Sequence, residues 1–308
     1  MISIIISKYH PSLIENVTAN IKNTIGVPFE IVIIENGKGE MGLCEVYNDG
    51  AQKAKYEILC FSHEDVEMQT MNWGSIVCDI FNKNKNLGLL GVAGSSYKPL
   101  SPSAWWYDNA DPGLQMTNYI QSNKTRHKGE LIYNNPFNEN LSDVVCVDGL
   151  WFCTPRNIAL SLKFDNSVFK GFHCYDIDYS LSVFQQYRVC VCFNILIRHY
   201  SEGNKNREWV YDTLKLTDKW GSVLPLHSTN FKGQSRRQEE MFAFYCFLKQ
   251  MLDLDFSLRK IFILPWSRKL ISLIGVRGVM KLMTQVAWDV YLKFKFTLGK
   301  IIRHRKRS

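Results

Sequence analysis

Two short acidic runs stand out because their positions fit metal-dependent chemistry. Residues 56–61 are apolar enough to form a buried strand, and His63, Glu64 and Asp65 follow at its C-terminal end. Ligands of open α/β sheets bind at that end of the strands. A carboxylate there can hold Mg²⁺ or Mn²⁺, and the ion can hold a diphosphate. With a second acidic run at residues 175–178, the sequence predicts a metal-held diphosphate and a carboxylate base, the combination that sugar transfer from a nucleotide sugar requires.

Composition and cysteine usage indicate a globular intracellular protein. Of 308 residues, 46% are hydrophobic and 13% are aromatic, which is ample for a core and too much for a disordered chain. The nine cysteines are odd in number, lie mostly in apolar runs and include no C-x-x-C motif. This usage predicts reduced, packed thiols in a cytosolic protein and not a disulfide framework.

The N-terminus is predicted to be a strand. Residues 1–7 are apolar, but they have no basic start and no small-residue cleavage site, so they do not resemble a signal peptide. No segment has the ~18–20 uninterrupted apolar residues of a spanning helix. We therefore expect the protein to stay in the cytoplasm.

The positive charge is concentrated at the C-terminus. Residues 259–308 hold 13 Lys and Arg against one acid, Asp289, a formal +12, so the rest of the chain carries −4 within the total of +8. Apolar and aromatic residues alternate with these cations, as in helices that lie in a membrane interface. Each cation near an anionic leaflet contributes ~1 kcal/mol to binding. The alternative is a basic helix pair that packs on the rest of the protein. Nucleic acid is not an expected partner, because no nucleic-acid-binding module is recognisable.

The elements that must position the acidic runs follow a βα alternation in the first hundred residues. Continuous β-branched strands separated by amphipathic helices predict an α/β fold with a mostly parallel sheet flanked by helices. The expected strands are 2–7, 29–34, 57–61 and 87–93, and the expected helices are 12–23, 42–54 and 70–82.

The second half is less regular. Residues 97–143 are polar and rich in Asn, Pro and Ser, so we expect a long functional loop. Beyond it, strands are expected at 144–147 and 189–197, and helices at 175–186, 208–220 and 236–253. We divide the chain into a catalytic domain, residues 1–230, and a helical, basic amphipathic, membrane-associating extension, residues 231–308.

The order and spacing of several motifs carry a family resemblance. Residues 1–210 resemble the glycosyltransferase family 2-like proteins of GT-A fold, and within them a bacterial subgroup with H-x-D in place of D-x-D. The matching stretches are residues 33–36, 42–48, 61–66, 147–151, 172–181 and 199–203.

The resemblance implies a divalent-cation site, for Mn²⁺ or Mg²⁺. Asp65 would bind the cation that bridges the donor's diphosphate, with His63 at the first position of the motif. His199 would supply a third ligand. Because Mn²⁺ accepts nitrogen ligands better than Mg²⁺ does, the histidine tilts the preference toward Mn²⁺. The alternative for both histidines is an ordinary hydrogen-bonded role.

The resemblance also implies the base of an inverting transfer. The family's base is the Asp of an E-D pair at the start of a helix, so Asp176 takes that role, although Tyr175 replaces the Glu. Asp178 is expected to be structural, since carboxylates in a first helical turn meet the helix dipole favourably.

Further residues are assigned to the two substrates by the same resemblance. Donor-binding candidates are Ser7, Glu35, Asn36, Asn48, Glu64 and Asp65. For Ser7, Glu35, Asn36 and Asn48 the alternative is a local role as a cap or turn residue. Acceptor-binding candidates are Trp105, Trp106, Asp148, Gly149 and Trp151. Aromatic side chains stack on sugar faces, and the alternative for both loop tryptophans is packing of the loop.

The hypothesis is therefore a glycosyltransferase, inverting and metal-dependent, that transfers a sugar from a nucleotide-sugar donor to a hydroxyl. The tail suggests a peripheral position on the inner face of the cell membrane and a glycan or lipid-linked glycan acceptor, as in bacterial surface polysaccharide assembly. Two alternatives stay open. A nucleotidyltransferase would need a Gly-rich loop after the first strand, and residues 7–11 contain no glycine. A degenerate, non-catalytic sugar-nucleotide-binding module would explain the replacements at His63 and Tyr175.

Overall fold

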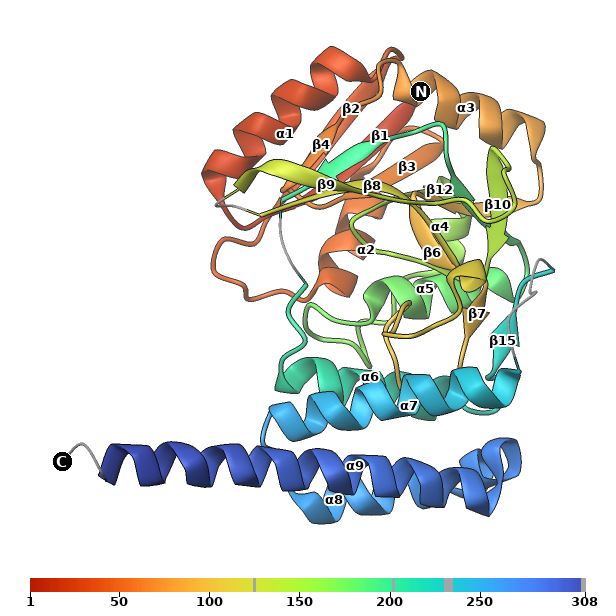
Figure 1. Ribbon diagram of the computed structural model, residues 1–308. Coiled ribbons are helices and arrows are strands. Elements are labelled where there is room, and N and C mark those ends of the chain that lie inside the picture. The colour runs from red at the N-terminus through yellow and green to blue at the C-terminus, as the bar shows by residue number, and fades with distance from the viewer. Residues whose placement is uncertain (124–125, 201–202, 230–234, 306–308) are drawn as a thin grey trace.

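The computed structural model describes residues 1–308 except 124–125, 201–202, 230–234 and 306–308 (Figure 1). Within the described residues, the central sheet has seven strands in the order β10-β13-β5-β12-β3-β1-β2. Five strands run in one direction, and β12 and β10 run antiparallel to their neighbours. The mostly parallel sheet is therefore confirmed. The strands are β1 (Ile2–Lys8), β2 (Phe29–Glu35), β3 (Ile58–Ser62), β5 (Leu87–Gly91), β10 (Leu141–Val144), β12 (Trp151–Pro155) and β13 (Arg188–Cys192).

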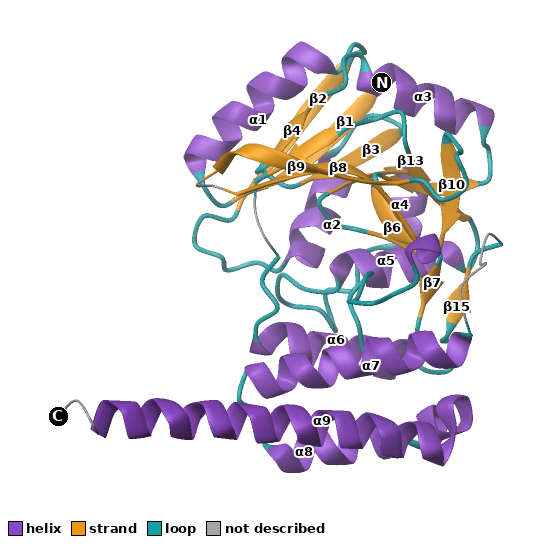
Figure 2. Ribbon diagram, in the orientation of Figure 1, coloured by secondary structure: helices purple, strands orange, loops and turns teal. Residues whose placement is uncertain are grey.

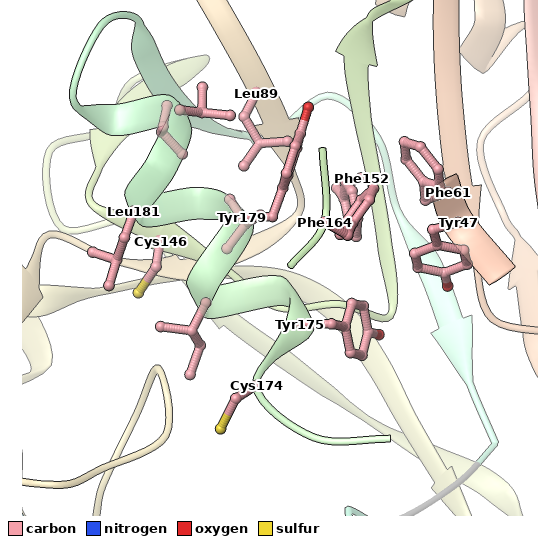
Figure 3. Packing of buried hydrophobic residues seen from close by; sticks show 14 of the residues in the cluster. Tyr47, Phe61, Leu89, Cys146, Phe152, Phe164, Cys174, Tyr175, Tyr179 and Leu181 are labelled. Carbon is pink, nitrogen blue, oxygen red and sulfur yellow. The ribbon is translucent and has the colours of Figure 1, made fainter. Parts of the chain in front are cut away.

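Helices cover both faces of this sheet (Figure 2). One core lies under α2 (Leu43–Lys53), α4 (Arg156–Leu162) and α5 (Tyr175–Phe184), and a second core lies under α1 (Pro11–Thr24) and α3 (Trp73–Lys83). Aromatic rings fill the first core, where Phe164 stacks on Tyr179 with 4.3 Å between ring centroids (Figure 3). All nine cysteines are free and seven are buried, as expected from the sequence.

The expected long loop at residues 97–143 is wrong. This segment contains the β8–β9 hairpin, which joins a second sheet in the order β11-β6-β8-β14-β4. Met116, Thr117 and Asn118 of β8 are all buried, so this strand has no alternating period, and its polar composition resembles that of a loop. The remaining elements are β4 (Val66–Met68), β6 (Ala93–Ser95), β7 (Tyr97–Lys98), η1 (Pro112–Leu114), β8 (Gln115–Asn123), β9 (Arg126–Asn134), β11 (Cys146–Val147), β14 (Ile197–His199) and β15 (Leu226–His227).

The C-terminal helices form a separate layer below the sheet (Figure 1). They are α6 (Arg207–Trp220), α7 (Arg236–Asp253), α8 (Leu258–Ile263), η2 (Leu264–Trp266) and α9 (Arg268–Arg305). Buried Trp209, Phe247, Ile274 and Leu282 share one core, so α6 and α7 pack against α9. Gly275 interrupts the helical backbone of α9 with φ 70°, a left-handed conformation that favours glycine.

Among the described residues, one helix, Arg268–Lys295, is long and apolar enough to cross a membrane by length and composition. A third of its most apolar window is buried against protein (33%). Helices of soluble cores pass the same test, so this finding does not by itself distinguish a span from a packed helix.

Candidate functional site

A cleft of about 840 Å³ opens at the C-terminal ends of β1 and β3. Ser7 lies near the C-terminal end of β1, and the turn of His63, Glu64 and Asp65 follows β3, so both strand ends contribute polar groups. Asn36 lines the same cleft after β2. The sequence-predicted edge of the sheet is therefore where the cavity lies, as parallel-strand topology requires.

Two histidines and one carboxylate converge at this edge. His63 Nδ1 lies 3.9 Å and His199 Nε2 lies 3.6 Å from Asp65 Oδ1. The three ligand atoms all lie within 4.8 Å of one another. His199 lies near Asp65 because β14 pairs antiparallel with β4. This pairing places His199 opposite Val66, the residue after Asp65. Nitrogen and oxygen donors at such separations fit a divalent transition-metal ion.

The orientation of His63 favours a ligand role. Tyr175 Oη donates to the carbonyl of Gly149 at 3.1 Å and lies 2.7 Å from His63 Nε2. When the phenol's one proton is donated to Gly149, Nε2–H of His63 donates to Oη, and the Nδ1 lone pair then faces Asp65. Burial lowers the pKa of His63 despite the opposing charge of Asp65. The neutral imidazole that binds metals is therefore favoured.

Asp176 is the expected base and lies at the start of α5, next to Tyr175. Burial is the main cause that raises the pKa of Asp176 to about 7, and the negative charge of Asp148 is the second. Hydrogen bonds from the backbone amides of Ile177 and Gly149 partly oppose this rise. The Gly149 amide donates to Asp176 Oδ2 at 3.0 Å. A carboxylate with a pKa near neutrality is suited to take a proton from a hydroxyl.

Asp148 and Gly149, two of the acceptor candidates, lie beside Asp176. Trp105 Nε1 donates to Asp148 Oδ2, and the amide of Leu150 donates to Asp148 Oδ1 at 2.8 Å. A Cβ at Gly149 would lie 2.1 Å from Tyr175 Oη and 3.0 Å from Asp176 Cβ. Glycine is therefore required for the close approach of this turn to the base.

Other candidates lie away from the cleft. Trp151 is 1% exposed and packs edge-on against Trp73, so it cannot touch an acceptor, and that assignment is wrong. Asn48 does not line the cleft, because its amide bonds both backbone groups of the distant Phe164 at 2.8 and 2.9 Å. Glu35 points to solvent and pairs with Lys8.

Several remaining side chains have local structural partners. Glu64 accepts from the amides of Tyr9 and His10 while lining the cleft. Asn36 bonds both backbone groups of Met41. Trp106 is 37% exposed and lies under Lys205, whose Nζ is 4.6 Å from the ring centroid.

Asp178 has the structural role that the sequence predicts. Its carboxylate pairs with Lys219 at 2.8 Å and accepts from Trp220 Nε1 at 2.7 Å. Both partners are on α6, so Asp178 joins α5 to the helical layer and takes no part in the cleft.

The sequence is matched over residues 3–220 by the family model described as glycosyltransferase like family. This match covers most of the chain. The chain belongs to the glycosyltransferase-like family. The protein is thus a glycosyltransferase, and the sheet with its flanking helices is the GT-A fold.

Solved structures support the fold of this glycosyltransferase. S. aureus TarS has a TM-score of 0.54 at 10% identity, covering 94% of this chain and 53% of that chain. TarS 1–349 in complex with UDP has a TM-score of 0.51 at 10% identity, covering 90% and 82%. The mannosyltransferase PcManGT from Pyrobaculum calidifontis, in complex with GDP-Man and Mn2+, has a TM-score of 0.50 at 11% identity, covering 94% and 87%. The chain spans about half of the TarS chain. No curated protein matches the sequence.

The sequence reasoning missed two contributions to the site of this glycosyltransferase. Tyr175 was taken only as a lost Glu, whereas its hydroxyl contacts His63. Phe172 and the α6 residues Glu208, Tyr211 and Asp212 also line the cleft. The sequence offers one signal for these residues: the acids Glu208 and Asp212 are four positions apart, so they share one face of a helix.

Proposed function

We propose that this glycosyltransferase catalyses inverting, metal-dependent transfer of a sugar from a nucleotide-sugar donor to a hydroxyl. The observation that carries the proposal is the link between two groups: Tyr175 touches the His63–Asp65–His199 cluster, and the next residue, Asp176, is a carboxylate whose pKa is raised to about 7. A cation site and a base are thus joined at one edge of the sheet.

The residues divide the reaction between them. Asp176 would accept the acceptor's hydroxyl proton while that oxygen attacks the anomeric carbon. The new C–O bond forms as the bond from the anomeric carbon to the diphosphate oxygen breaks, with inversion, and the nucleoside diphosphate leaves. His63, Asp65 and His199 would hold a divalent cation, which when bound neutralises charge on the diphosphate. Ser7 and Asn36 line the part of the cleft assigned to the nucleotide.

The cation proposed is Mn²⁺ in preference to Mg²⁺. Two of the three candidate ligands are imidazoles, and Mg²⁺ prefers oxygen ligands. The PcManGT structure, which resembles this chain in fold, holds GDP-Man and Mn2+. This likeness supports the cation class.

Calorimetry with UDP-, GDP- and dTDP-sugars tests the proposal. We expect one nucleotide to bind with Mn²⁺, more weakly with Mg²⁺ and not with EDTA. Asp65→Ala should abolish the metal-dependent part. His173→Ala is the matched control, because His173 is partly buried but bonds Asn206 outside the cluster. Metal-independent binding, or equal loss in His173→Ala, would refute the cation site.

Activity assays separate the two alternatives. A degenerate module would bind a donor without hydrolysing it, and Asp176→Asn would then behave like wild type in cells. A nucleotidyltransferase would release pyrophosphate from a nucleoside triphosphate. The loop after β1 counts against the latter, because Glu64 already occupies the amides of Tyr9 and His10 that could face a triphosphate.

We also propose that the outer surface of α8–α9 binds the inner leaflet of the cell membrane. The side of α9 toward α7 buries Ile274, Val279 and Leu282. Other positions of α8, η2 and α9 expose apolar side chains: Ile263, Trp266, Val276, Met280, Trp288, Tyr291 and Phe294, each 47–66% exposed. Exposed cations flank them at Arg259, Lys260, Arg268, Lys269, Arg277, Lys281 and Lys295. Aromatic groups beside cations suit an anionic interface.

A lipid-linked glycan is the acceptor that this position favours, as in surface polysaccharide assembly. Co-sedimentation of the full chain with vesicles tests the membrane step. Vesicles containing anionic lipid should bind the protein at low salt, and neutral vesicles should bind it less. Equal partitioning to both, or full solubility with anionic vesicles, would refute this surface.

A further inference from the structure

The segment 97–107, here called the strap, crosses from β7 to the active site and is held by two acids of α7. Glu239 and Glu240 are adjacent, and both are buried, at 1% and 0% exposure. They lie beyond residues 3–220, over which the family model matches. No step of the proposed reaction uses them.

Glu240 gathers four donors from the strap. Its Oε1 accepts from Tyr97 Oη at 2.8 Å and from the amide of Leu100 at 2.9 Å. Its Oε2 accepts from the amide and the hydroxyl of Ser101 at 2.8 and 2.6 Å. Glu239 accepts from Tyr107 Oη at 2.8 Å. The two acids therefore fix both ends of the strap.

Burying two carboxylates lowers the stability of the fold unless their oxygens accept hydrogen bonds. A buried carboxylate loses its hydration and is tolerated only where donors replace it. Charge-assisted hydrogen bonds are short and directional, so they set the position of the backbone that donates them. Inside the strap, buried Lys98 bonds the carbonyl and hydroxyl of Ser103 at 3.1 and 2.6 Å, which stiffens its middle.

The strap ends on the turn that holds the base. Trp105, 7% exposed, donates its indole N–H to Asp148. The amide of the next residue, Gly149, donates to Asp176. The contacts are therefore continuous from α7 through the strap and the 148–150 turn to the catalytic carboxylate.

We propose that Glu239, Glu240 and Trp105 are positioning residues that hold the Asp148–Gly149 turn, and through it Asp176, in place for proton transfer. The same turn also touches the cation cluster, because the amide of His63 donates to the carbonyl of Leu150 at 3.0 Å and Tyr175 Oη contacts both the Gly149 carbonyl and His63 Nε2. The inference rests on the proposed role of Asp176. It assigns to α7 a larger part in turnover than in donor binding.

The experiment measures Mn²⁺-dependent hydrolysis of the UDP-, GDP- or dTDP-sugar that the wild type consumes, with calorimetry of the same donor. Trp105→Phe keeps a buried ring and removes the N–H to Asp148. Glu240→Gln replaces a carboxylate oxygen by an amide N–H that faces donors. Trp73→Phe is the matched control, because Trp73 is also buried and makes one indole hydrogen bond, to Thr24 at 3.2 Å, far from the strap.

We expect Trp105→Phe and Glu240→Gln to lower kcat about tenfold or more, with donor affinity within about twofold of wild type. Trp73→Phe should lower the melting temperature without changing kcat. Unchanged kcat in folded Trp105→Phe, or a parallel loss of donor affinity, would overturn the inference, and Trp105→Phe decides it even if Glu240→Gln does not fold. If the wild type hydrolyses no donor, the proposed function fails instead. In that case the NMR resonance of the Trp105 indole N–H still tests the hydrogen bond to Asp148, because it should shift in Asp148→Asn relative to wild type.

Discussion

The two sides of Asp176 are constructed differently. On the donor side, His63 and Asp65 follow one strand of a parallel sheet, and His199 reaches them through the pairing of β14 with β4. On the acceptor side, the base is approached by a strap whose anchors, Ser101 and Glu240, are 139 residues apart in sequence. Topology alone gathers the first set of groups, whereas specific buried hydrogen bonds gather the second.

This difference implies a separation of duties. The donor side should control metal and nucleotide affinity, and the acceptor side should control turnover. Substitutions that affect one quantity and leave the other unchanged sharpen the comparison, and substitutions that affect both quantities contradict it.

The largest effect is expected at the base itself. Asp176→Asn removes the proton acceptor, so kcat should fall about 10²–10⁴-fold, the usual contribution of a general base. Donor affinity should remain, because the Gly149 amide still has an oxygen to bond. Asp178→Asn is the control: it loses the negative charge that pairs with Lys219 and should cost stability, while the folded fraction turns over normally. Comparable kcat losses in both variants would show that Asp176 acts only through the fold.

A smaller effect is expected on the donor side at Tyr175. Tyr175→Phe removes the hydroxyl that orients His63, and such partners typically contribute 10- to 100-fold in metal affinity. Titration with Mn²⁺ alone, followed by electron paramagnetic resonance, measures the loss directly. Mn²⁺ affinity equal to that of the wild type would show that Tyr175 does not orient a ligand.

How much of this the sequence alone predicted depends on the same difference. The strands expected at 2–7 and 57–61 lie at 2–8 and 58–62, and the cluster of His63, Asp65 and His199 was also expected, because β-branched runs and strand-end position are local signals. The β8–β9 hairpin was missed, since its Asn, Thr and Gln residues are typical of loops and three successive residues of β8, 116–118, are buried without alternation. β12 was missed because a five-residue buried strand has no period. Glu239 and Glu240 were not singled out within the helix expected at 236–253, since nothing local marks a partner 140 positions away.

The pH profile gives a graded test of the acceptor side. A base works only when deprotonated, and the pKa of Asp176 is raised to about 7 by burial and then by Asp148. Turnover should therefore rise with pH through about 7 and fall roughly tenfold per pH unit below it. Asp148→Asn removes the negative neighbour, which lowers the pKa of Asp176 and moves the acidic limb to lower pH. A limb that stays in place, or that moves upward, would exclude Asp148 as a source of the shift.

The smallest effects are expected at the helical layer, which lies outside both sides of the site. Trp288 is 61% exposed on α9, so Trp288→Ser should leave the melting temperature unchanged. Loss of its partial burial in lipid, worth about 1 kcal/mol, should weaken binding to anionic vesicles about fivefold. Leu131→Ser is the matched control, because Leu131 is 57% exposed on β9, away from this layer. If both variants bind vesicles like wild type, insertion of the Trp288 ring does not contribute to membrane binding, and the exposed cations are its remaining source. If vesicle binding falls only in Trp288→Ser and donor hydrolysis in solution does not change, the membrane surface is separate from the chemistry that the strap and the strand ends perform.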